Sequence, residues 1–296
     1  MPLTVLDAET RQLCTEDVQD ERVIRFLYGT ALGRALAIAL FSRRWFSQLY
    51  TWFDRTAFSR RSIAAFIRRF DIAVDEFMPR DYASFNDFFI REFKPGRRPF
   101  VVEPGQLPAT AEARYSGWRS SNEVPGFTIK QAAYTLGTLL SKPQWLPCFT
   151  DGPVLIARLA PQDYHRLHVV DAGDIVDHYR IDGALHCVNP FATARMPEIF
   201  ALNKRQVTIQ RTHHFGLVAY IDIGAMTVGS IVNTLASNTA VTRGDERGHF
   251  QFGGSTVVIL GERGRWQPHP DILHNTQAGR EVFVKLGRTV GMKEPA

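Results

Sequence analysis

The sequence predicts an α+β protein, with a β-rich, mostly antiparallel core and a group of basic amphipathic helices on its N-terminal side. Short runs rich in β-branched and aromatic residues follow one another closely after residue 105, with glycine and Asn-Pro turn signals between them. No long helical pattern separates these runs, so a doubly wound parallel sheet is not expected. Residues 22–70 instead carry apolar side chains at helical spacings of three and four.

Composition divides the 296 residues into three segments. Residues 1–21 are predicted to be a polar tail, residues 22–104 an amphipathic helical, membrane-associating region with a connector, and residues 105–296 a β-rich catalytic domain. The apolar share of 45% suffices for a sizeable core. No run approaches about 18 uncharged apolar residues, so we expect no spanning helix. The acidic N-terminus lacks the apolar segment of a secretory signal.

The 22–70 segment is strongly basic, because it carries ten arginines and one acidic residue, Asp54. Arginine pairs at Arg43-Arg44, Arg60-Arg61 and Arg68-Arg69 divide it into about three short helices. An arginine-rich amphipathic stretch bordered by Trp and Tyr is typical of a helix in a membrane interface. Composition equally allows a helical cap that packs on the core and leaves its arginines in water. Nucleic-acid binding is not expected, because no recognition motif accompanies the charge.

The connector, residues 71–104, contains the segment SFNDFFIREFKPGRRPF. Its aromatic residues Phe85, Phe88, Phe89 and Phe93 have helical spacing, and we expect most of them to pack in the core. Lys94-Pro95-Gly96 then ends the helix and opens a turn.

The β-rich domain contains a series of strand-like runs between turn signals. We predict strands at residues 153–159, 166–170, 174–181, 206–212, 215–224, 227–232 and 255–260.

Cysteine use and net charge limit the classes of site and partner. Cys14, Cys148 and Cys187 are far apart and show no CxxC spacing, so neither a disulfide framework nor a metal site is expected. Few cysteines favour a reducing compartment. The net charge of +5 suits an anionic partner, such as an anionic membrane surface or an acidic substrate.

Two histidines stand close together in the segment APQDYHRLHVVDAG (160–173). His165 and His168 would share one face of a helix but lie on opposite faces of a strand. Nothing nearby resembles a HExxH or CxxC set, so zinc is not expected. A single histidine is more often structural, but two beside Asp163 and Tyr164, at the start of a strand, are candidates for acid–base chemistry.

The most unusual feature is the turn Gly253-Gly254-Ser255-Thr256 between aromatic and β-branched residues. Two glycines in a strand allow backbone shapes that other residues resist. The turn is therefore either a glycine bulge or a strained peptide bond that the next hydroxyl attacks. A Ser/His hydrolase is not expected, because the G-x-S-x-G elbow is absent and a strand, not a helix, follows Ser255.

An internal reaction fits these residues better. The Ser255 hydroxyl would attack the carbonyl carbon of Gly254 and convert the amide into an ester, and elimination across Cα–Cβ of Ser255 would cut the chain. The dehydroalanine left behind would hydrolyse to a pyruvoyl group. A histidine suits both proton transfers. A pyruvoyl carbonyl condenses with a substrate amine and serves as an electron sink for decarboxylation.

Four motifs together resemble the phosphatidylserine decarboxylase family, in its GGST-type branch. They are FGGSTVV, DYHRLH, SFNDFFIREFKPGRRPF and VGSI (228–231), and their order and spacing match that family from about residue 22 to residue 261. The resemblance implies a proenzyme that cuts itself between Gly254 and Ser255. The products would be a β chain (1–254) and an α chain (255–296) that begins with the pyruvoyl group.

The resemblance also implies the site residues, the cofactor and the partners. Ser255 would become the covalent pyruvoyl cofactor, and His168, the last residue of DYHRLH, would be the catalytic histidine. His165, Gly253 and Thr256 would support them. The substrate would be phosphatidylserine and the product phosphatidylethanolamine. The implied enzyme is a homodimer, peripheral to the cytoplasmic side of the cell membrane.

One position departs from the family pattern. The family's third residue for self-cleavage is an aspartate, and the stretch PATAEARYSGW (108–118) places Glu112 there. Glutamate keeps the charge with one more methylene, so it is expected to orient His168, and its different reach is expected to slow the reaction. Glu112 as an ordinary surface acid would instead make the chain an unprocessed, non-enzymatic lipid-binding relative. A soluble amino-acid decarboxylase on the same scaffold is the other alternative, although the basic helices count against it.

Overall fold

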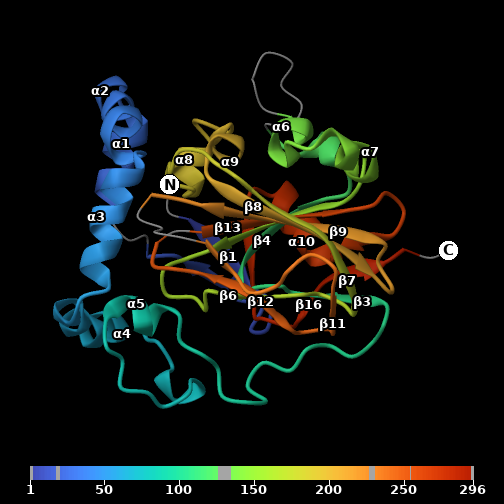
Figure 1. Ribbon diagram of the computed structural model, residues 1–296, viewed down its shortest axis with the longest axis horizontal. Helices are drawn as coiled ribbons and strands as arrows, with labels where there is room; N and C mark the ends of the chain where they lie inside the picture. The colour runs from blue at the N-terminus through green and yellow to red at the C-terminus, as the bar shows by residue number, and fades with distance from the viewer. Residues whose placement is uncertain (1–2, 18–20, 126–134, 227–230, 254, 295–296) are drawn as a thin grey trace.

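The computed structural model describes residues 3–17, 21–125, 135–226, 231–253 and 255–294. Figure 1 shows a body of β-sheets with short helices packed against it, and a column of N-terminal helices along one side of that body.

The core is a 10-stranded sheet in which neighbouring strands run antiparallel, except for one parallel pair, β1 with β15. Its spatial order is β11 (Thr239–Val241), β7 (Gly173–Ile181), β8 (Arg205–Thr212), β9 (Leu217–Gly224), β13 (Ser255–Gly261), β5 (Val154–Leu159), β4 (Ala113–Trp118), β15 (Glu281–Val284), β1 (Thr4–Asp7) and β2 (Leu13–Thr15). The predicted α+β class with a mostly antiparallel core is confirmed.

Two smaller antiparallel sheets pack with the large one. One has the order β10 (Ile231–Asn233), β12 (Glu246–Phe250), β6 (Arg166–His168), and the other β14 (Trp266–Pro268), β16 (Thr289–Lys293), β3 (Gln106–Pro108). Most predicted strand runs coincide with observed strands. The run predicted at 227–232 overlaps β10, but residues 227–230, with most of the VGSI motif, lie outside the described residues.

Strand β13 lies in the middle of the large sheet, between β9 and β5, and all of its residues are buried. The run Thr256–Leu260 is rich in β-branched side chains, which pack well when both faces of a strand are covered. The strand therefore places its first residue, Ser255, inside the protein.

The column in Figure 1 is part of an N-terminal helical arm, residues 21–70. It comprises α1 (Glu21–Gly29), α2 (Ala31–Leu36), a π-helical turn (Ala37–Phe41), α3 (Arg44–Asp54), a 3₁₀ turn (Ala57–Ser62) and α4 (Ile63–Phe70). Gly33 lets α2 fold back on α1, because a Cβ there would overlap the carbonyl oxygen of Phe26. None of the described helices could span a membrane alone; α1 with Ala31–Phe41 has the length and composition, but the pair is bent by 97°.

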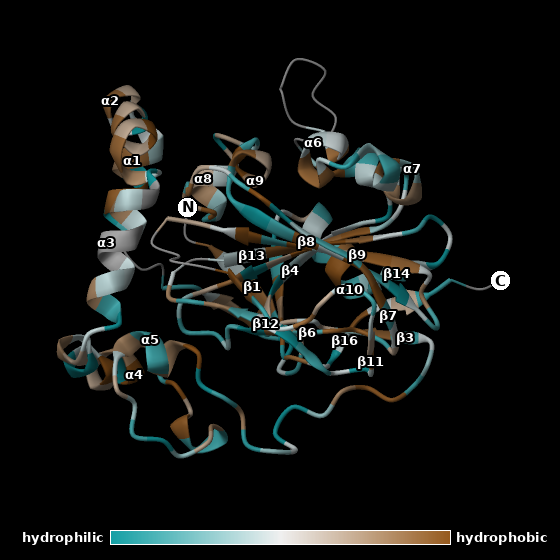
Figure 2. Cartoon of the chain, viewed as in Figure 1, coloured by the Kyte–Doolittle hydropathy of each residue, from teal (hydrophilic) through white to brown (hydrophobic). Residues whose placement is uncertain are grey.

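The arm has one face on the body and another in solvent. Leu27, Tyr28 and Ala37 are buried, and the Tyr28 hydroxyl accepts a hydrogen bond from the backbone N–H of Cys187 (2.8 Å). Large apolar side chains are nevertheless exposed along it, namely Val23, Phe26, Leu32, Ile38, Trp45, Trp52, Phe53 and Phe58. Figure 2 shows hydrophobic and hydrophilic residues alternating along this column.

The remaining helices are short. They are α5 (Phe85–Phe89), α6 (Leu136–Leu140), α7 (Leu146–Phe149), α8 (Pro190–Thr193), α9 (Ile199–Leu202) and α10 (Pro270–Gln277), with 3₁₀ turns at Val74–Glu76, Ser121–Glu123 and Pro143–Trp145. Helix α5 ends before Phe93, although the aromatic spacing predicted a helix that includes it. Phe93 instead forms a β-bridge with Phe77 and stacks on its ring, with centroids 4.6 Å apart.

Residues 1–21 were expected to form a polar tail, but part of this segment belongs to the core sheet. β1 pairs with β15 and with β2. Beyond β2, Glu16 forms ion pairs with Arg114 (3.2 Å) and Arg158 (2.6 Å) and is almost fully buried. The sequence does not reveal that Glu16 is buried, because the arginines that pair with it lie about a hundred or more residues away along the chain. The other domain boundaries stay predictions.

Candidate active site

Ser255 begins β13, opposite Leu159 of β5 and Gly224 of β9. Its side chain is fully buried, and its hydroxyl donates to the carbonyl oxygen of Gly253 at 3.5 Å. Gly253 has a φ of 140°, in the range that favours glycine. Gly254, the other half of the predicted cleavage site, lies outside the described residues.

Phe252 anchors the segment that leads to Ser255. Its ring makes edge-to-face contacts with Phe85 and Phe89, with centroids 4.8 and 5.0 Å apart. Its backbone N–H donates to Oδ1 of Asn86 (3.1 Å). These partners belong to α5, so the predicted aromatic motif packs directly against the approach to the Gly-Gly-Ser-Thr turn.

The Asp-Tyr-His part of DYHRLH folds back onto the end of β5. The N–H of Ala160 donates to the carboxylate of Asp163 (2.6 Å), and the carbonyl of Ala160 accepts from the N–H of Asp163 (2.9 Å) and from Nε2 of His165 (3.0 Å). Ala160 directly follows Leu159, the strand partner of Ser255. The turn therefore holds Asp163 and His165 at the end of β5 that faces Ser255.

Two arginines that the sequence did not predict as site residues hold this turn. Arg114 forms an ion pair with Asp163, and Arg91 donates to the carbonyl oxygens of Gln162 (2.6 Å) and Asp163 (3.0 Å). Burial raises the pKa of Asp163, and Arg114 opposes that shift. No local pattern identifies these arginines, because they lie 49 and 72 residues from Asp163 in the chain.

His165 is fully buried, and its ring stacks on Phe89 with centroids 3.9 Å apart. A carbonyl oxygen only accepts, so Nε2, which faces Ala160, carries the proton and Nδ1 carries the lone pair. Within the part of the chain that the structure describes, this buried Nδ1 has no hydrogen-bond partner. Burial lowers the pKa of His165 to about 3, so the ring is neutral at neutral pH.

His168 is half-buried at the other end of β6, and both of its ring nitrogens have partners. Nδ1 donates to the carbonyl oxygen of Gly244 (2.8 Å), which leaves Nε2 to accept from the hydroxyl of Tyr164 (3.4 Å). Burial also lowers the pKa of His168.

The pairing of β6 with β12 sets the two histidines apart. The N–H of Phe250 donates to the carbonyl oxygen of His165 (3.0 Å), whereas His168 pairs with Glu246. The chain continues from Phe250 towards Ser255, so His165 is at the end of the ladder nearer to Ser255. Three residues of extended chain span roughly 10 Å. The ladder therefore places His165 nearer than His168 to the end of β12 that continues towards Ser255, and the role of His168 stays a prediction.

Glu112 is buried, and its carboxylate binds Arg98 at 2.6 Å (Nε to Oε2) and 3.3 Å (Nη2 to Oε1). Arg98 also pairs with Glu76 (2.7 Å), so the connector is tied to the body. No hydrogen bond or ion pair joins Glu112 to His168 among the described residues; His168 instead contacts Thr110 through its backbone. The role of Glu112 in self-cleavage stays a prediction.

Comparisons with known proteins agree on one family. The sequence profile of the family described as phosphatidylserine decarboxylase matches residues 85–292. The chain is 34% identical to the phosphatidylserine decarboxylase proenzyme of Desulfitobacterium hafniense over 289 residues, 97% of each chain. It is 35% identical to that of Chlamydia pneumoniae over 292 residues (98% and 97% of the two chains) and 36% identical to that of Chlamydia trachomatis over 286 residues (94% and 95%). The chain belongs to the phosphatidylserine decarboxylase family.

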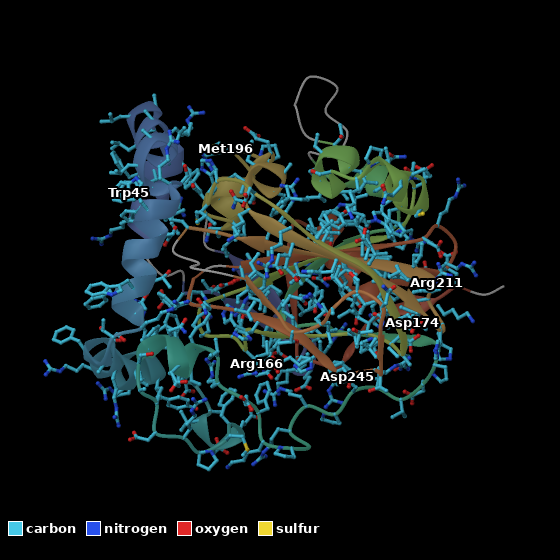
Figure 3. The ribbon with its side chains drawn as sticks, in the orientation of Figure 1. Trp45, Arg166, Asp174, Met196, Arg211 and Asp245 are labelled. Atoms are coloured by element: carbon cyan, nitrogen blue, oxygen red, sulfur yellow. The ribbon has the colours of Figure 1, made fainter. Side chains whose placement is uncertain are left out.

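Arg166 of this phosphatidylserine decarboxylase family member links the strands around the site. Its guanidinium donates to the carbonyl oxygen of Ile90 (3.0 Å) and pairs with Glu246 (2.9 Å) and Glu92 (2.7 Å). Figure 3 labels Arg166 in the body of the protein, whereas Trp45 lies on the arm.

Thr256 lies on the opposite face of β13 from Ser255, because side chains alternate along a strand. It is buried, and its hydroxyl has no hydrogen-bond partner among the residues that the structure describes. Thr256 lines a cavity together with Arg158, its strand neighbour on β5. The supporting role predicted for Thr256 in this family member stays a prediction.

Proposed function

We propose that this chain is a carboxy-lyase that converts phosphatidylserine to phosphatidylethanolamine, after cutting itself between Gly254 and Ser255. The observation that supports this most is the fully buried Ser255, which follows Gly253 and the predicted cleavage position and pairs with the end of β5. His165 is hydrogen-bonded to Ala160, the residue after that end. Relatives that match nearly the whole chain are named phosphatidylserine decarboxylase proenzymes.

Self-cleavage needs only the chain and water. A base takes the proton of Ser255 Oγ as it attacks the carbonyl carbon of Gly254; the C–N bond breaks and the amide nitrogen takes the proton, which leaves an ester. The base then removes the Cα proton of Ser255, and the Gly254 carboxylate leaves from Cβ. The dehydroalanine takes up water and releases ammonia, so the α chain begins with a pyruvoyl group.

His165 is the base that the geometry favours for this step. Its ring is neutral at neutral pH, and its Nδ1 has no hydrogen-bond partner in the part of the chain that the structure describes. The ring contacts Phe89, which packs on Phe252 before the turn. Ser255 and His165 are both fully buried, so bulk water is kept from the ester before elimination.

The residues present fit a pyruvoyl cofactor, because a buried serine and a neutral histidine base meet the needs of its formation. The bound group would supply a carbonyl that withdraws electrons as the substrate loses carbon dioxide. His168 is our candidate for returning a proton to the substrate, and the Tyr164 hydroxyl, 3.4 Å from its Nε2, orients its ring.

The helical arm is the proposed membrane contact. It carries exposed apolar side chains, such as Trp45 and Trp52, together with ten arginines, which would attract anionic headgroups while the apolar side chains enter the acyl boundary. The proposed site of action is the cytoplasmic side of the cell membrane. A homodimer is also proposed, on the family resemblance alone, and sedimentation analysis tests it.

Denaturing electrophoresis and a decarboxylation assay test the proposal together. The wild-type chain should give two fragments with a blocked N-terminus on the smaller one, and should release carbon dioxide from phosphatidylserine in mixed micelles. Ser255→Ala should stay intact at 33.5 kDa and be inactive. An intact wild-type band would contradict self-cleavage. Activity on free serine but not on the phospholipid would favour the soluble amino-acid decarboxylase instead.

A further inference from the structure

Two cavities that share part of their walls lie between the large sheet and the segment that contains α8 and α9. The larger has a volume of about 850 Å³, and its wall includes Ser116, Trp118, Ile156, Arg158, Thr256 and Phe200. The smaller, about 220 Å³, lies beside α1, and its wall includes Ile24, Arg25, Phe191 and Arg195. Leu3, Pro190 and Ala194 line both, so the two spaces adjoin.

The wall of the larger cavity is mostly apolar, with a few polar groups. Arg158 is neutralised by Glu281 (2.5 Å), whereas Arg280 has no ion-pair partner among the described residues and donates only to Asn275. The buried hydroxyl of Thr256, in this wall, has no hydrogen-bond partner among the residues with described positions. A volume near the top of the usual range of roughly 300–1,000 Å³, with few polar groups, suits an amphipathic ligand.

The smaller cavity is bordered by two cations. The guanidinium groups of Arg25 and Arg195 both lie over the ring of Phe191, 5.0 and 3.5 Å from its centroid. Arg25 pairs with Glu21 of the same helix, but both side chains are about half exposed, and such surface pairs contribute little. A phosphate can therefore compete for Arg25, and arginine binds phosphate with two parallel hydrogen bonds.

We infer that these two cavities bind an anionic phospholipid, with an acyl chain in the larger cavity and the phosphate at Arg25 and Arg195. The apolar wall fits the acyl chain. An ester carbonyl of the lipid would accept a hydrogen bond from the Thr256 hydroxyl, which has no acceptor within the described residues. Helix α1 exposes Val23 and Phe26 on the arm, so the lipid can enter from a bilayer in contact with the arm.

This site is separate from the reactive serine. Ser255 and Thr256 point to opposite faces of β13, and none of the residues that line either cavity is His165, His168 or Ser255. A lipid bound here would contact the second residue of the α chain without reaching the reacting atoms.

Quenching of Trp118 fluorescence tests the inference. The protein is the Ser255→Ala variant, which cannot form the cofactor, so failure of the proposed reaction does not affect the result. The probe is a lysophosphatidylglycerol with a brominated stearoyl chain, kept below its micelle concentration; it has no amine and is not a substrate. Saturable quenching of the fluorescence is expected. Trp118→Phe should remove this saturable quenching, although the exposed Trp45 and Trp52 still fluoresce in that variant.

Charge variants provide a second test. Arg25→Gln with Arg195→Gln should weaken binding about tenfold, which corresponds to about 1.4 kcal/mol. Arg34→Gln, an exposed arginine of α2 outside both cavities, is the matched control and should have no effect. The phosphocholine lipid with the same chain should bind more weakly. Equal quenching in Trp118→Phe, or equal binding after loss of both arginines, would overturn the inference.

Discussion

At the scale of single residues, the two histidines of DYHRLH differ in the hydrogen bonds of their ring nitrogens. Among the described residues, the buried Nδ1 of His165 has no hydrogen-bond partner, whereas both nitrogens of His168 have partners. The family resemblance implied His168 as the catalytic histidine and His165 as a supporting residue. The residues themselves do not rank the two, because the ranking depends on Ala160, Gly244 and Tyr164 as hydrogen-bond partners. A base must have its lone pair directed at the proton that it removes, so these partners decide the roles.

Variants of the two histidines should separate the two reactions. His165→Ala should slow self-cleavage by about 10²–10⁴-fold, the usual range for loss of a general base. His168→Ala should still cleave, but should lose decarboxylation after cleavage. Quantitative electrophoresis of freshly translated protein measures the first step, and carbon dioxide release from purified, cleaved protein measures the second. Cleavage lost in His168→Ala and kept in His165→Ala would reverse our assignment.

The ion pair of Glu112 gives this residue a testable role. Removing one partner from a buried pair costs about 3 kcal/mol, because the other charge stays buried alone. Glu112→Gln should therefore lower the free energy of unfolding by about that amount and slow self-cleavage. If Glu112 acts through Arg98, then Arg98→Gln should slow cleavage comparably. The change in activation free energy in the double variant should then be less than the sum of the changes in the two single variants. Slow cleavage in Glu112→Gln, with normal cleavage in Arg98→Gln, would instead support direct action of Glu112 on a histidine.

At the scale of elements, the arm has features of both structures that its sequence allowed, a helical cap on the core and a helix in a membrane interface. Tyr28 and Ala37 are buried against the body as in a helical cap, while Trp45 and Trp52 stay exposed as in an interfacial helix. Periodicity reveals that a helix has an apolar stripe, but not that α2 folds back at Gly33 and divides the stripe between body and solvent. Helix α5 shows a similar limit, because the partner of Phe93 is Phe77 rather than the next helical turn.

Point variants test membrane contact more sharply than deletion of the arm, which would remove buried residues such as Leu27 and Phe66. Trp52→Ser should weaken binding to anionic liposomes about tenfold or more, since burying one large apolar side chain contributes about 1.5–3 kcal/mol. Val102→Ser is the matched control, because Val102 is 83% exposed but lies on the connector. Liposome flotation gives the measurement, and equal loss in both variants would count against a specific arm–membrane contact.

At the scale of the whole molecule, the sequence predicted the class of fold and a set of candidate site residues, but not the contacts that hold these residues in place. The antiparallel core follows from closely spaced strand patterns, and Ser255 follows from two glycines in such a pattern. Strands β1 and β2 were missed, because their segment resembles a polar tail. Glu16, just after β2, is in fact buried, and its partners Arg114 and Arg158 lie on β4 and β5. Contacts between residues far apart in the chain leave no local periodicity, so they become visible only in the fold.

Burial of neutral histidines should make the whole molecule sensitive to acid. Desolvation lowers the pKa of His165, His168, His178 and His186 below the ordinary value of 6.5. In the unfolded chain these groups take up protons below about pH 6.5, whereas folded His165 does so only near pH 3. The free energy of unfolding should therefore fall as the pH decreases below 6.5, by up to about 1.4 kcal/mol per pH unit for each histidine.

Chemical denaturation of the intact Ser255→Ala variant between pH 7.5 and about pH 4.5 measures this slope. Below that range, carboxylates with lowered pKa values such as Glu16 and Glu246 add their own loss of stability. His165→Gln cannot take up a proton, so its slope should be shallower by about 1.4 kcal/mol per pH unit. His274→Gln, at an exposed position of α10, should keep the original slope. An unchanged slope in His165→Gln would mean that the folded protein accommodates the protonated ring, which would remove the neutral base from the proposed mechanism.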